Sequence, residues 1–147
     1  MSHWVYKDKK VSNIPEGEPF GFVYRIVNTI DGRFYIGRKQ FYNTRRKKIP
    51  GKVRRKVTVT ESNWKSYTGS SKTLNADIDL LGKEKFSFEV LGFAYTKGQL
   101  NYLEEHVQFV TKALISDRCY NDSIGNKKFM SIRIDENFRN SLKNLEV

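Results

Sequence analysis

Two tyrosines, spaced so that they can face one pocket, are the first residues of this sequence that could do chemistry. Tyr24 lies within residues 21–26, and Tyr35 begins the triplet Tyr35-Ile36-Gly37 eleven residues after Tyr24. A phenol has a pKa of about 10, so it takes part in proton transfer only where a cation or metal-bound water favours the phenolate. Aromatic and β-branched residues flank the turn signal Asp31-Gly32. We therefore expect a β-hairpin that places the two tyrosines on neighbouring strands.

Several familiar catalytic patterns are missing from the chain. It contains no HExxH, no cysteine–histidine zinc pattern, no Walker loop and no paired acidic clusters of the two-metal type. The single Cys119 excludes an internal disulfide, fits a reducing compartment and is expected to be a small apolar residue near a helix end. We expect no signal peptide, and no apolar run of about 18 residues occurs in residues 1–147. We therefore expect a cytoplasmic protein with no membrane partner.

The charge of the chain indicates a polyanionic partner. Its 27 basic and 16 acidic residues give a formal net charge of +11. A field of this sign attracts polyanions and speeds encounter with them. A charged surface that only aids solubility is the alternative. An anionic membrane is less favoured, because no basic amphipathic helix with an aromatic face occurs.

The hydrophobic pattern predicts one domain of α/β (α+β) class. Strands are expected at residues 21–28, 33–38 and 86–91, where aromatic and β-branched residues dominate. Ser70 or Ser71 is expected to cap a helix that stops at Gly82. Together these elements predict a three-stranded, mainly antiparallel sheet flanked by helices.

A second helix is expected to open at Thr96, which begins a capping box with Gln99. Glu104, Glu105 and Gln108 are expected near the edges of its apolar stripe. The predicted stripe consists of Leu100, Leu103, Val107, Val110 and Leu114.

We divide the chain into three parts. Residues 1–20 form an N-terminal arm, in which two prolines and a glycine prevent a helix and Trp4 packs on the domain. Residues 21–126 form the domain, with a basic insertion at about 38–60. Residues 127–147 form a C-terminal tail, in which a short amphipathic helix is expected at 134–145.

The hairpin resembles the signature of the GIY-YIG nuclease superfamily, spelled here Phe22-Val23-Tyr24 and Tyr35-Ile36-Gly37. Further blocks follow in the order expected of small phage-encoded, free-standing homing-endonuclease-like members, so that the resemblance covers roughly residues 16–126. These blocks are residues 63–71, 81–86, 101–104 and 120–121. The resemblance implies a compact GIY-YIG domain and an endonuclease that hydrolyses DNA with one Mg²⁺ (or Mn²⁺) ion. It would act in the host cytoplasm if the chain is phage-encoded.

The resemblance also implies roles for individual residues. Tyr24 matches the tyrosine that accepts a proton from the attacking water, and Tyr35 the tyrosine that hydrogen-bonds near the scissile phosphate. Glu104 matches the glutamate that holds the metal, and Asn121 the asparagine that supports the site. Each tyrosine alone also fits a packed strand residue with a satisfied hydroxyl. Gly37 either leaves room for close approach or simply ends a strand.

The family's catalytic arginine has no direct counterpart. Asn63 stands at its position, and Tyr67 stands where many members carry a histidine. Arg38 and Lys39, directly after Gly37, are the leading substitutes, and Lys39 is expected to share the face of Tyr35. Arg45 is the reserve candidate. A basic group here would stabilise charge in the transition state.

The basic insertion is expected to be a solvated, irregular loop that orders on DNA, with a brief strand at residues 57–60. Contacts from such a segment position a duplex without reading its sequence. The residues expected to bind DNA are Arg45, Arg46, Lys47, Lys48, Lys52, Arg54, Arg55, Lys56, Trp64, Lys65 and Tyr67.

The predicted activity is therefore Mg²⁺-dependent cleavage of double-stranded DNA. One rival is a catalytically inactive DNA-binding protein with a degenerate nuclease core, which the missing arginine keeps open. Another rival is a nuclease directed at RNA. The sequence leaves the oligomeric state open, a homodimer included.

Overall fold

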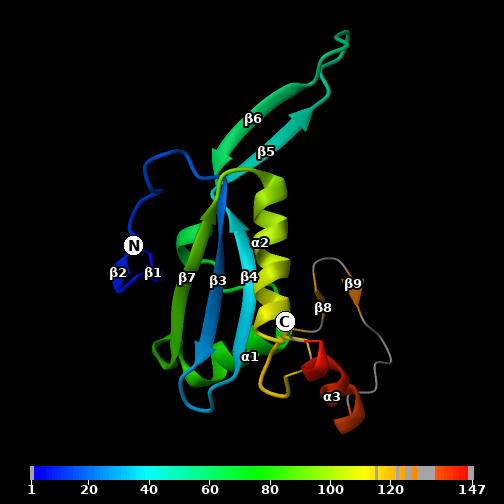
Figure 1. Cartoon of the computed structure of the whole chain (residues 1–147). Helices are drawn as coiled ribbons and strands as arrows, with labels where there is room; N and C mark the ends of the chain where they lie inside the picture. Colours follow the sequence, from blue (N-terminus) through cyan, green and yellow to red (C-terminus); the bar gives the residue numbers. More distant parts are fainter. Residues whose placement is uncertain (1, 115, 122, 125–126, 129–134, 146–147) are drawn as a thin grey trace.

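The computed structural model describes residues 2–114, 116–121, 123–124, 127–128 and 135–145 (Figure 1). The strands are β1 Val5–Tyr6, β2 Lys9–Lys10, β3 Gly21–Asn28, β4 Phe34–Gln40, β5 Tyr42–Lys47, β6 Lys56–Glu61, β7 Phe86–Ala94, β8 Ser123–Ile124 and β9 Lys127–Lys128. The helices are η1 Trp64–Ser66, α1 Lys72–Leu81, η2 Lys83–Lys85, α2 Lys97–Val110 and α3 Glu136–Asn144. Within this part of the chain, no helix combines the length and apolar character that a membrane crossing requires.

A five-stranded sheet in the order β2-β1-β7-β3-β4 forms the centre of the molecule. β3 pairs antiparallel with both β4 and β7, which confirms the three predicted strands. The predicted number of strands was wrong, because the N-terminal arm adds β1 and β2. β1 runs parallel to β7, with Val5 opposite Glu89. The sheet is therefore mixed, and the predicted α+β class is confirmed.

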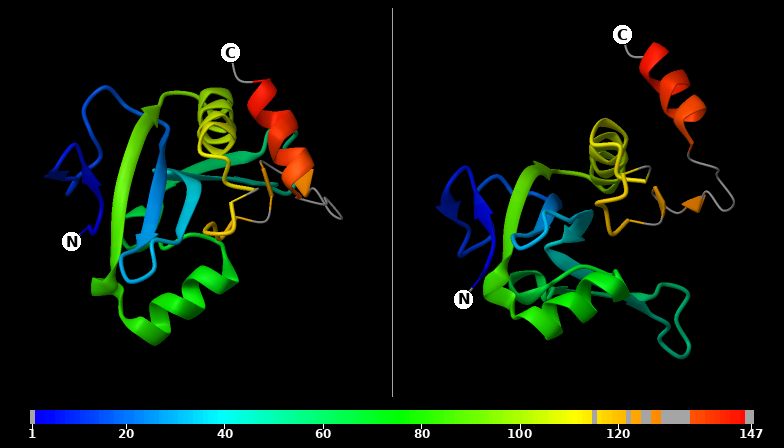
Figure 2. Two further views of the ribbon diagram at one scale, coloured as in Figure 1. Left: turned by 60° about the horizontal axis from the view of Figure 1, so that its bottom comes forward. Right: turned by 90° about the horizontal axis from the view of Figure 1, so that it is seen from below.

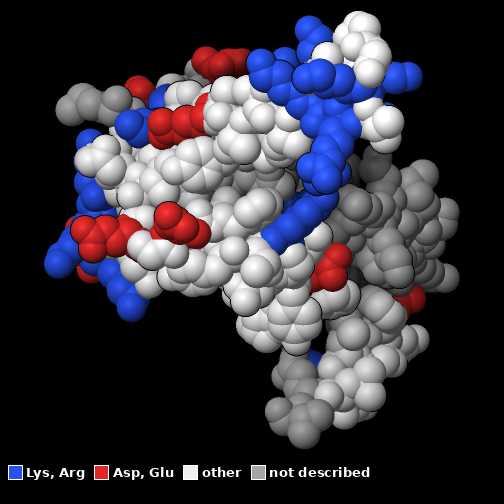
Figure 3. All heavy atoms as spheres, turned by 90° about the horizontal axis from the view of Figure 1, so that it is seen from above, with Lys and Arg blue, Asp and Glu red and all other residues white. Residues whose placement is uncertain are grey.

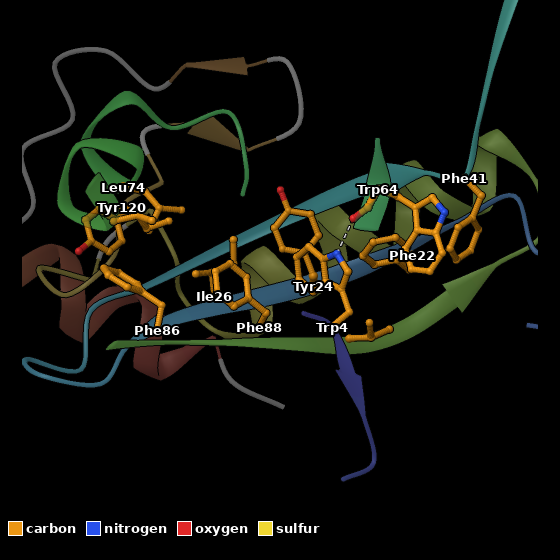
Figure 4. Close-up of a cluster of buried hydrophobic side chains, with 12 residues drawn as sticks. Trp4, Phe22, Tyr24, Ile26, Phe41, Trp64, Leu74, Phe86, Phe88 and Tyr120 are labelled. Carbon is orange, nitrogen blue, oxygen red and sulfur yellow. Dashed lines mark hydrogen bonds between the residues drawn. The ribbon is translucent and has the colours of Figure 1, made fainter. Parts of the chain in front are cut away.

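One face of the sheet carries an aromatic core that includes the N-terminal arm (Figure 4). Trp4, Phe22, Tyr24 and Trp64 are each at most 1% exposed. The Trp4 indole N–H donates a hydrogen bond of 2.6 Å to the carbonyl of Trp64. Since buried indole nitrogens require a partner, this bond lets Trp4 enter the core without leaving a polar group unsatisfied. The prediction that Trp4 packs on the domain is confirmed.

The helices α1 and α2 lie on opposite sides of the sheet (Figure 2). The α1 side chains Leu74 and Ile78 join the aromatic core. On the other face, Leu100 of α2 packs with Val23 and Ile36, which are fully buried. Strand residues one apart point to opposite faces, so β3 and β4 serve both cores with alternate side chains.

The buried face of α2 differs from the predicted apolar stripe. Val110 is 65% exposed, whereas Glu104 and Gln108, expected at the edges, are buried. Residues four apart on a helix share a face, so Leu100, Glu104 and Gln108 form one line toward the sheet. The stripe prediction was therefore partly wrong, and the helix turns two polar side chains inward.

The predicted helix ends are confirmed. The hydroxyl of Ser71 accepts a hydrogen bond from the Leu74 N–H, and that of Thr96 accepts one from the Gln99 N–H. These bonds satisfy first-turn amides that have no partner within the helix. α1 ends at Gly82, whose φ of 93° suits a residue without a Cβ atom. The predicted C-terminal helix is α3, capped by Asp135.

A two-stranded ribbon, β5–β6, projects from one end of the sheet (Figure 1). The prediction of an irregular loop was wrong, because residue pairs from Tyr42–Glu61 to Lys47–Lys56 form a continuous antiparallel ladder. The brief strand predicted at residues 57–60 lies within β6 and is confirmed. β-branched valine and threonine in β6 favour this extended backbone. Every residue of both strands is exposed, so the ribbon forms no core of its own.

Candidate active site

The strand register brings the two tyrosines onto one face of the sheet. Tyr24 lies opposite Gly37, and Ile26 lies opposite Tyr35. The tyrosines are therefore diagonal neighbours across β3 and β4. Their ring centroids are 6.2 Å apart. The predicted hairpin is present, and the two tyrosine rings are neighbours on one of its faces.

Gly37 makes room for this pair. A Cβ atom at Gly37 would lie 2.4 Å from the Tyr24 hydroxyl oxygen and 2.9 Å from Cε1 of Tyr35. Gly37 sits inside β4 and not at its end. Of the two explanations offered for Gly37, close approach therefore holds, since no side chain fits between the phenols.

The loop that follows η1, residues 67–71, packs against both tyrosines. The Tyr67 ring meets the Tyr24 ring edge-on at 6.3 Å. The hydroxyls of Tyr35 and Ser70 lie 3.0 Å apart and share a hydrogen bond. At Gly69, which has a φ of 86°, a Cβ atom would lie 3.0 Å from the Tyr35 ring. The backbone at Gly69 therefore lies directly against the side chains of Tyr35 and Tyr24.

Both phenols are held in their protonated form. Burial raises the pKa of Tyr24 well above its usual value, and Tyr35, Tyr67 and Glu104 add smaller upward effects. Burial also raises the pKa of Tyr35, against the hydrogen bond from Ser70. A low-dielectric pocket disfavours the phenolate, so a nearby positive charge is required before either tyrosine can act as a base.

Glu104 lies on the α2 side of the sheet, beside Arg38 of β4. Its side chain is only 12% exposed. β4 is the edge strand of the sheet, so no further strand separates its α2 side from the side that carries the tyrosines. The Glu104 charge acts on both Tyr24 and Tyr35. The carboxylate lies on one side of β4 and the two phenols on the other, and their shared role in one site stays a prediction.

Two basic residues of β4 flank this group. The Arg38 Nε atom lies 3.8 Å from a carboxylate oxygen of Glu104. Burial raises the pKa of Glu104, the Arg38 charge partly opposes this, and Glu105 adds to it. Lys39 pairs with Phe22 and so lies on the tyrosine face, where its ammonium sits 4.1 Å from the centroid of the Tyr67 ring. Burial lowers the pKa of Lys39.

The two leading substitutes for the arginine thus lie on opposite faces of β4, Arg38 beside Glu104 and Lys39 beside Tyr67. Arg45, the reserve candidate, lies in β5 on the projecting ribbon and is exposed. In the part of the chain that the structure describes, no ion pair links Arg45 to Glu104.

Residues 4–134 match the family model described as "Putative endonuclease segE, GIY-YIG domain". This chain belongs to that GIY-YIG family. No curated protein and no solved structure matches it. The two tyrosine triplets of β3 and β4 are the GIY-YIG signature, and their register explains its spacing.

Asn121 supports the GIY-YIG hairpin by a pair of hydrogen bonds. Its Oδ1 accepts from the Ile36 N–H at 2.9 Å, and its Nδ2 donates to the Ile36 carbonyl at 2.7 Å. Gln108 donates a longer bond of 3.4 Å to the same carbonyl. Ile36 separates Tyr35 from Gly37, so Asn121 fixes the edge-strand backbone between two site residues. Gln108, which was expected near the edge of the apolar stripe and was not included among the predicted site residues, is buried and bonds to the same backbone position.

The residues predicted to bind DNA differ in how far they are exposed. Trp64 was wrongly assigned, because its ring is fully buried and its indole N–H donates to Glu61 at 2.8 Å. Tyr67 borders the tyrosine pocket, and Lys65 is half-buried beside η1. Ser70 was predicted only as a possible helix cap. Its hydrogen bond to the Tyr35 hydroxyl was not predicted, although Ser70 lies in a block that carries the family resemblance. The remaining predicted residues, all exposed, are Arg45, Arg46, Lys47, Lys48, Lys52, Arg54, Arg55 and Lys56.

The donor set of the site fits a hard divalent cation held largely by water. Among the described residues, no three His, Cys, Asp or Glu side chains gather as a multidentate metal cluster. Glu104 offers one carboxylate, with phenol oxygens on the other side of β4. Mg²⁺ prefers oxygen ligands and retains several waters, so one carboxylate and a substrate phosphate can hold it. The burial that raises the pKa of Glu104 also makes a cation partner favourable.

Proposed function

We propose that the protein hydrolyses phosphodiester bonds of double-stranded DNA with one Mg²⁺ (or Mn²⁺) ion. The observation that supports this proposal is the pairing of Tyr24 with Tyr35 on one face of the edge strand β4, with Glu104 beside Arg38 on its other face. Family membership supports an endonuclease in general. The positive charge of the chain supports a polyanionic substrate.

Each residue of the pocket would have a distinct task. A divalent cation held by Glu104 would neutralise charge on the phosphate and lower the pKa of bound water. Tyr24 would accept a proton from the attacking water once positive charge nearby lowers its raised pKa. Tyr35, already hydrogen-bonded to Ser70, would orient a phosphate oxygen.

A basic side chain would stabilise the charge that develops on the phosphate. Arg38 is the best candidate for this role, because it lies beside Glu104. Its guanidinium can contact a phosphate oxygen through two parallel N–H groups. Lys39 would hold the opposite side of the pocket through its contact with Tyr67.

The decisive experiment compares two neighbouring glutamates in a plasmid nicking assay with Mg²⁺. Glu104→Gln should reduce cleavage by about 100-fold or more, because a metal ligand supplies several kcal/mol to the transition state. Glu105→Gln is the matched control, since Glu105 is exposed and one position further along the same helix. Its cleavage should stay within about threefold of wild type. Unchanged cleavage by Glu104→Gln would contradict the proposed role.

A DNA-binding protein with an inactive nuclease core is the second candidate. Asn63 stands where the family carries its arginine, and Tyr24 is only 1% exposed. This candidate prevails if the wild-type protein binds duplex DNA but never cuts it with Mg²⁺ or Mn²⁺. A parallel assay on RNA decides between nucleic-acid substrates.

A further inference from the structure

The β5–β6 ribbon has two chemically different faces. Alternate residues of a strand share a face, and the register pairs Asn43 with Thr60, Arg45 with Thr58 and Lys47 with Lys56. Each of these six side chains carries a group that can form hydrogen bonds, and none is wholly apolar. We call this side the polar face. The opposite face carries Tyr42, Thr44, Arg46, Val57, Val59 and Glu61.

The charge of the ribbon suits a nucleic acid. Residues 42–61 contain eight basic residues and one acidic residue, Glu61. In the described part of the chain, none of these basic residues takes part in an ion pair. Lys and Arg atoms gather in a band on the end of the molecule from which the ribbon projects (Figure 3). These cations are therefore available to an external polyanion.

The base of the ribbon is fixed to the site-bearing sheet. Phe41, between β4 and β5, is fully buried. The Ser62 N–H donates to the Phe41 carbonyl at 2.8 Å, and the Ser62 hydroxyl donates to the Gln40 carbonyl at 2.6 Å. Both ends of the ribbon are thus tied to the end of β4. These bonds fix the base of the ribbon relative to β4, the strand that contains Gly37.

The dimensions of the ribbon match one groove of duplex DNA. Six residues per strand span roughly 20 Å. The major groove of B-DNA is about 12 Å wide and admits a two-stranded ribbon, whereas the major groove of A-form RNA is too narrow and deep for side chains to read. Asparagine and arginine can each make two hydrogen bonds to base edges there, to adenine and guanine respectively.

We propose that the polar face of the ribbon enters the major groove of duplex DNA and contacts base edges through Asn43 and Arg45. Arg46, on the opposite face, contacts a phosphate. This inference rests on the proposed function and extends it, because it makes the ribbon a reader of sequence and not only a clamp on phosphates. The base preference would then set where the pocket cuts.

The test compares two adjacent arginines that differ only in the face they occupy. Arg45→Gln and Arg46→Gln remove the same charge from exposed positions of β5, so both variants should fold. Duplexes bound by the wild-type protein are selected from a random pool in EDTA, and affinities for one selected and one scrambled duplex are measured by fluorescence anisotropy. The absence of metal keeps binding independent of cleavage.

Arg45→Gln should weaken binding to the selected duplex by about tenfold or more and binding to the scrambled duplex far less. Arg46→Gln should weaken both equally and reduce the salt dependence by about one phosphate contact. Wild-type protein, but not Arg45→Gln, should protect guanine N7 in the major groove from methylation.

Equal losses for the two variants on both duplexes, or protection of adenine N3 in the minor groove, would overturn the inference. A wild-type protein that binds no duplex would also overturn it. If binding and N7 protection hold while no DNA is cut, the ribbon inference stands and only the proposed catalysis fails.

Discussion

The strand β4 and the ribbon that continues from it are adjacent in sequence but are built in opposite ways. At Gly37 there is no space for a single methyl group beside the Tyr24 hydroxyl. Only a few residues later, every side chain of β5 is exposed. Proton transfer and metal binding require groups held within fractions of an ångström, whereas attraction of a polyanion requires charge and reach. The difference therefore separates the section suited to catalysis from the section suited to binding.

The two regions also differ in what holds them. The site-bearing strands lie between two cores, and the site is supported by groups from α2, from the loop after η1 and by Asn121. The ribbon is held by its own ladder and by its anchored base. Substitutions in the sheet should therefore change stability or catalysis, and substitutions in the ribbon should change binding alone.

The largest effect should come from the aromatic core. Trp4→Ala should lower the free energy of unfolding by about 3–5 kcal/mol, because it empties a fully buried site and removes a hydrogen bond to Trp64. Val59→Ala in the ribbon, where the side chain is 58% exposed, should change it by less than about 0.5 kcal/mol. Urea unfolding measures both. Similar values for the two variants would show that the arm does not belong to the core.

A second contrast uses glycines. Gly37→Ala should reduce DNA cleavage by about 10- to 100-fold while the chain remains folded, because the methyl group displaces Tyr24 and Tyr35. Gly51 in the ribbon has a φ of 77°, but a Cβ atom added there would meet no other atom within 4 Å, so Gly51→Ala strains only its own turn. Cleavage rates and circular dichroism test this contrast. Wild-type cleavage by Gly37→Ala would mean that the phenols need no close approach.

The third contrast is the pH dependence of the cleavage rate in two variants, Tyr24→Phe and Tyr42→Phe. Burial raises the pKa of Tyr24, so the reactive phenolate is scarce at neutral pH and increases about tenfold per pH unit below that pKa. Single-turnover cleavage should therefore rise with pH between about 6 and 9. Tyr24→Phe should cleave more slowly and lose this slope, whereas Tyr42→Phe in the ribbon should keep it. A slope that survives in Tyr24→Phe would assign the base to another group.

The smallest expected effect concerns stability without metal. Burial raises the pKa of Glu104, so the folded state holds its proton more tightly than the unfolded state. The free energy of unfolding of the wild type should fall as pH rises above 4.5, the usual value for glutamate, through the raised pKa. In EDTA, Glu104→Gln should therefore melt a few degrees higher than wild type at neutral pH and not below pH 4. Glu61→Gln, at the exposed base of the ribbon, should show no such difference.

The sequence predicted the hairpin well and the surroundings of its side chains less well. The hairpin of Tyr24 and Tyr35 follows from local signals, a turn with glycine between two aromatic stretches. The inward position of Glu104 could not be predicted, because helical periodicity alone treats a glutamate as an edge residue. Trp64 was expected to contact DNA, yet its ring packs on Phe41 and Phe22, which come from distant parts of the chain, and is buried in the core.

Local chemistry by itself determined the strands, the helix caps and the excess of positive charge. These features depend on residues a few positions apart, whose preferences are expressed in any context. Only the tertiary structure decided that β4 is an edge strand, that Glu104 is buried beside Arg38, and that the basic insertion is a ribbon with a polar face. Such outcomes depend on which distant segments pair and which face is left uncovered, and these are properties of the packed molecule as a whole.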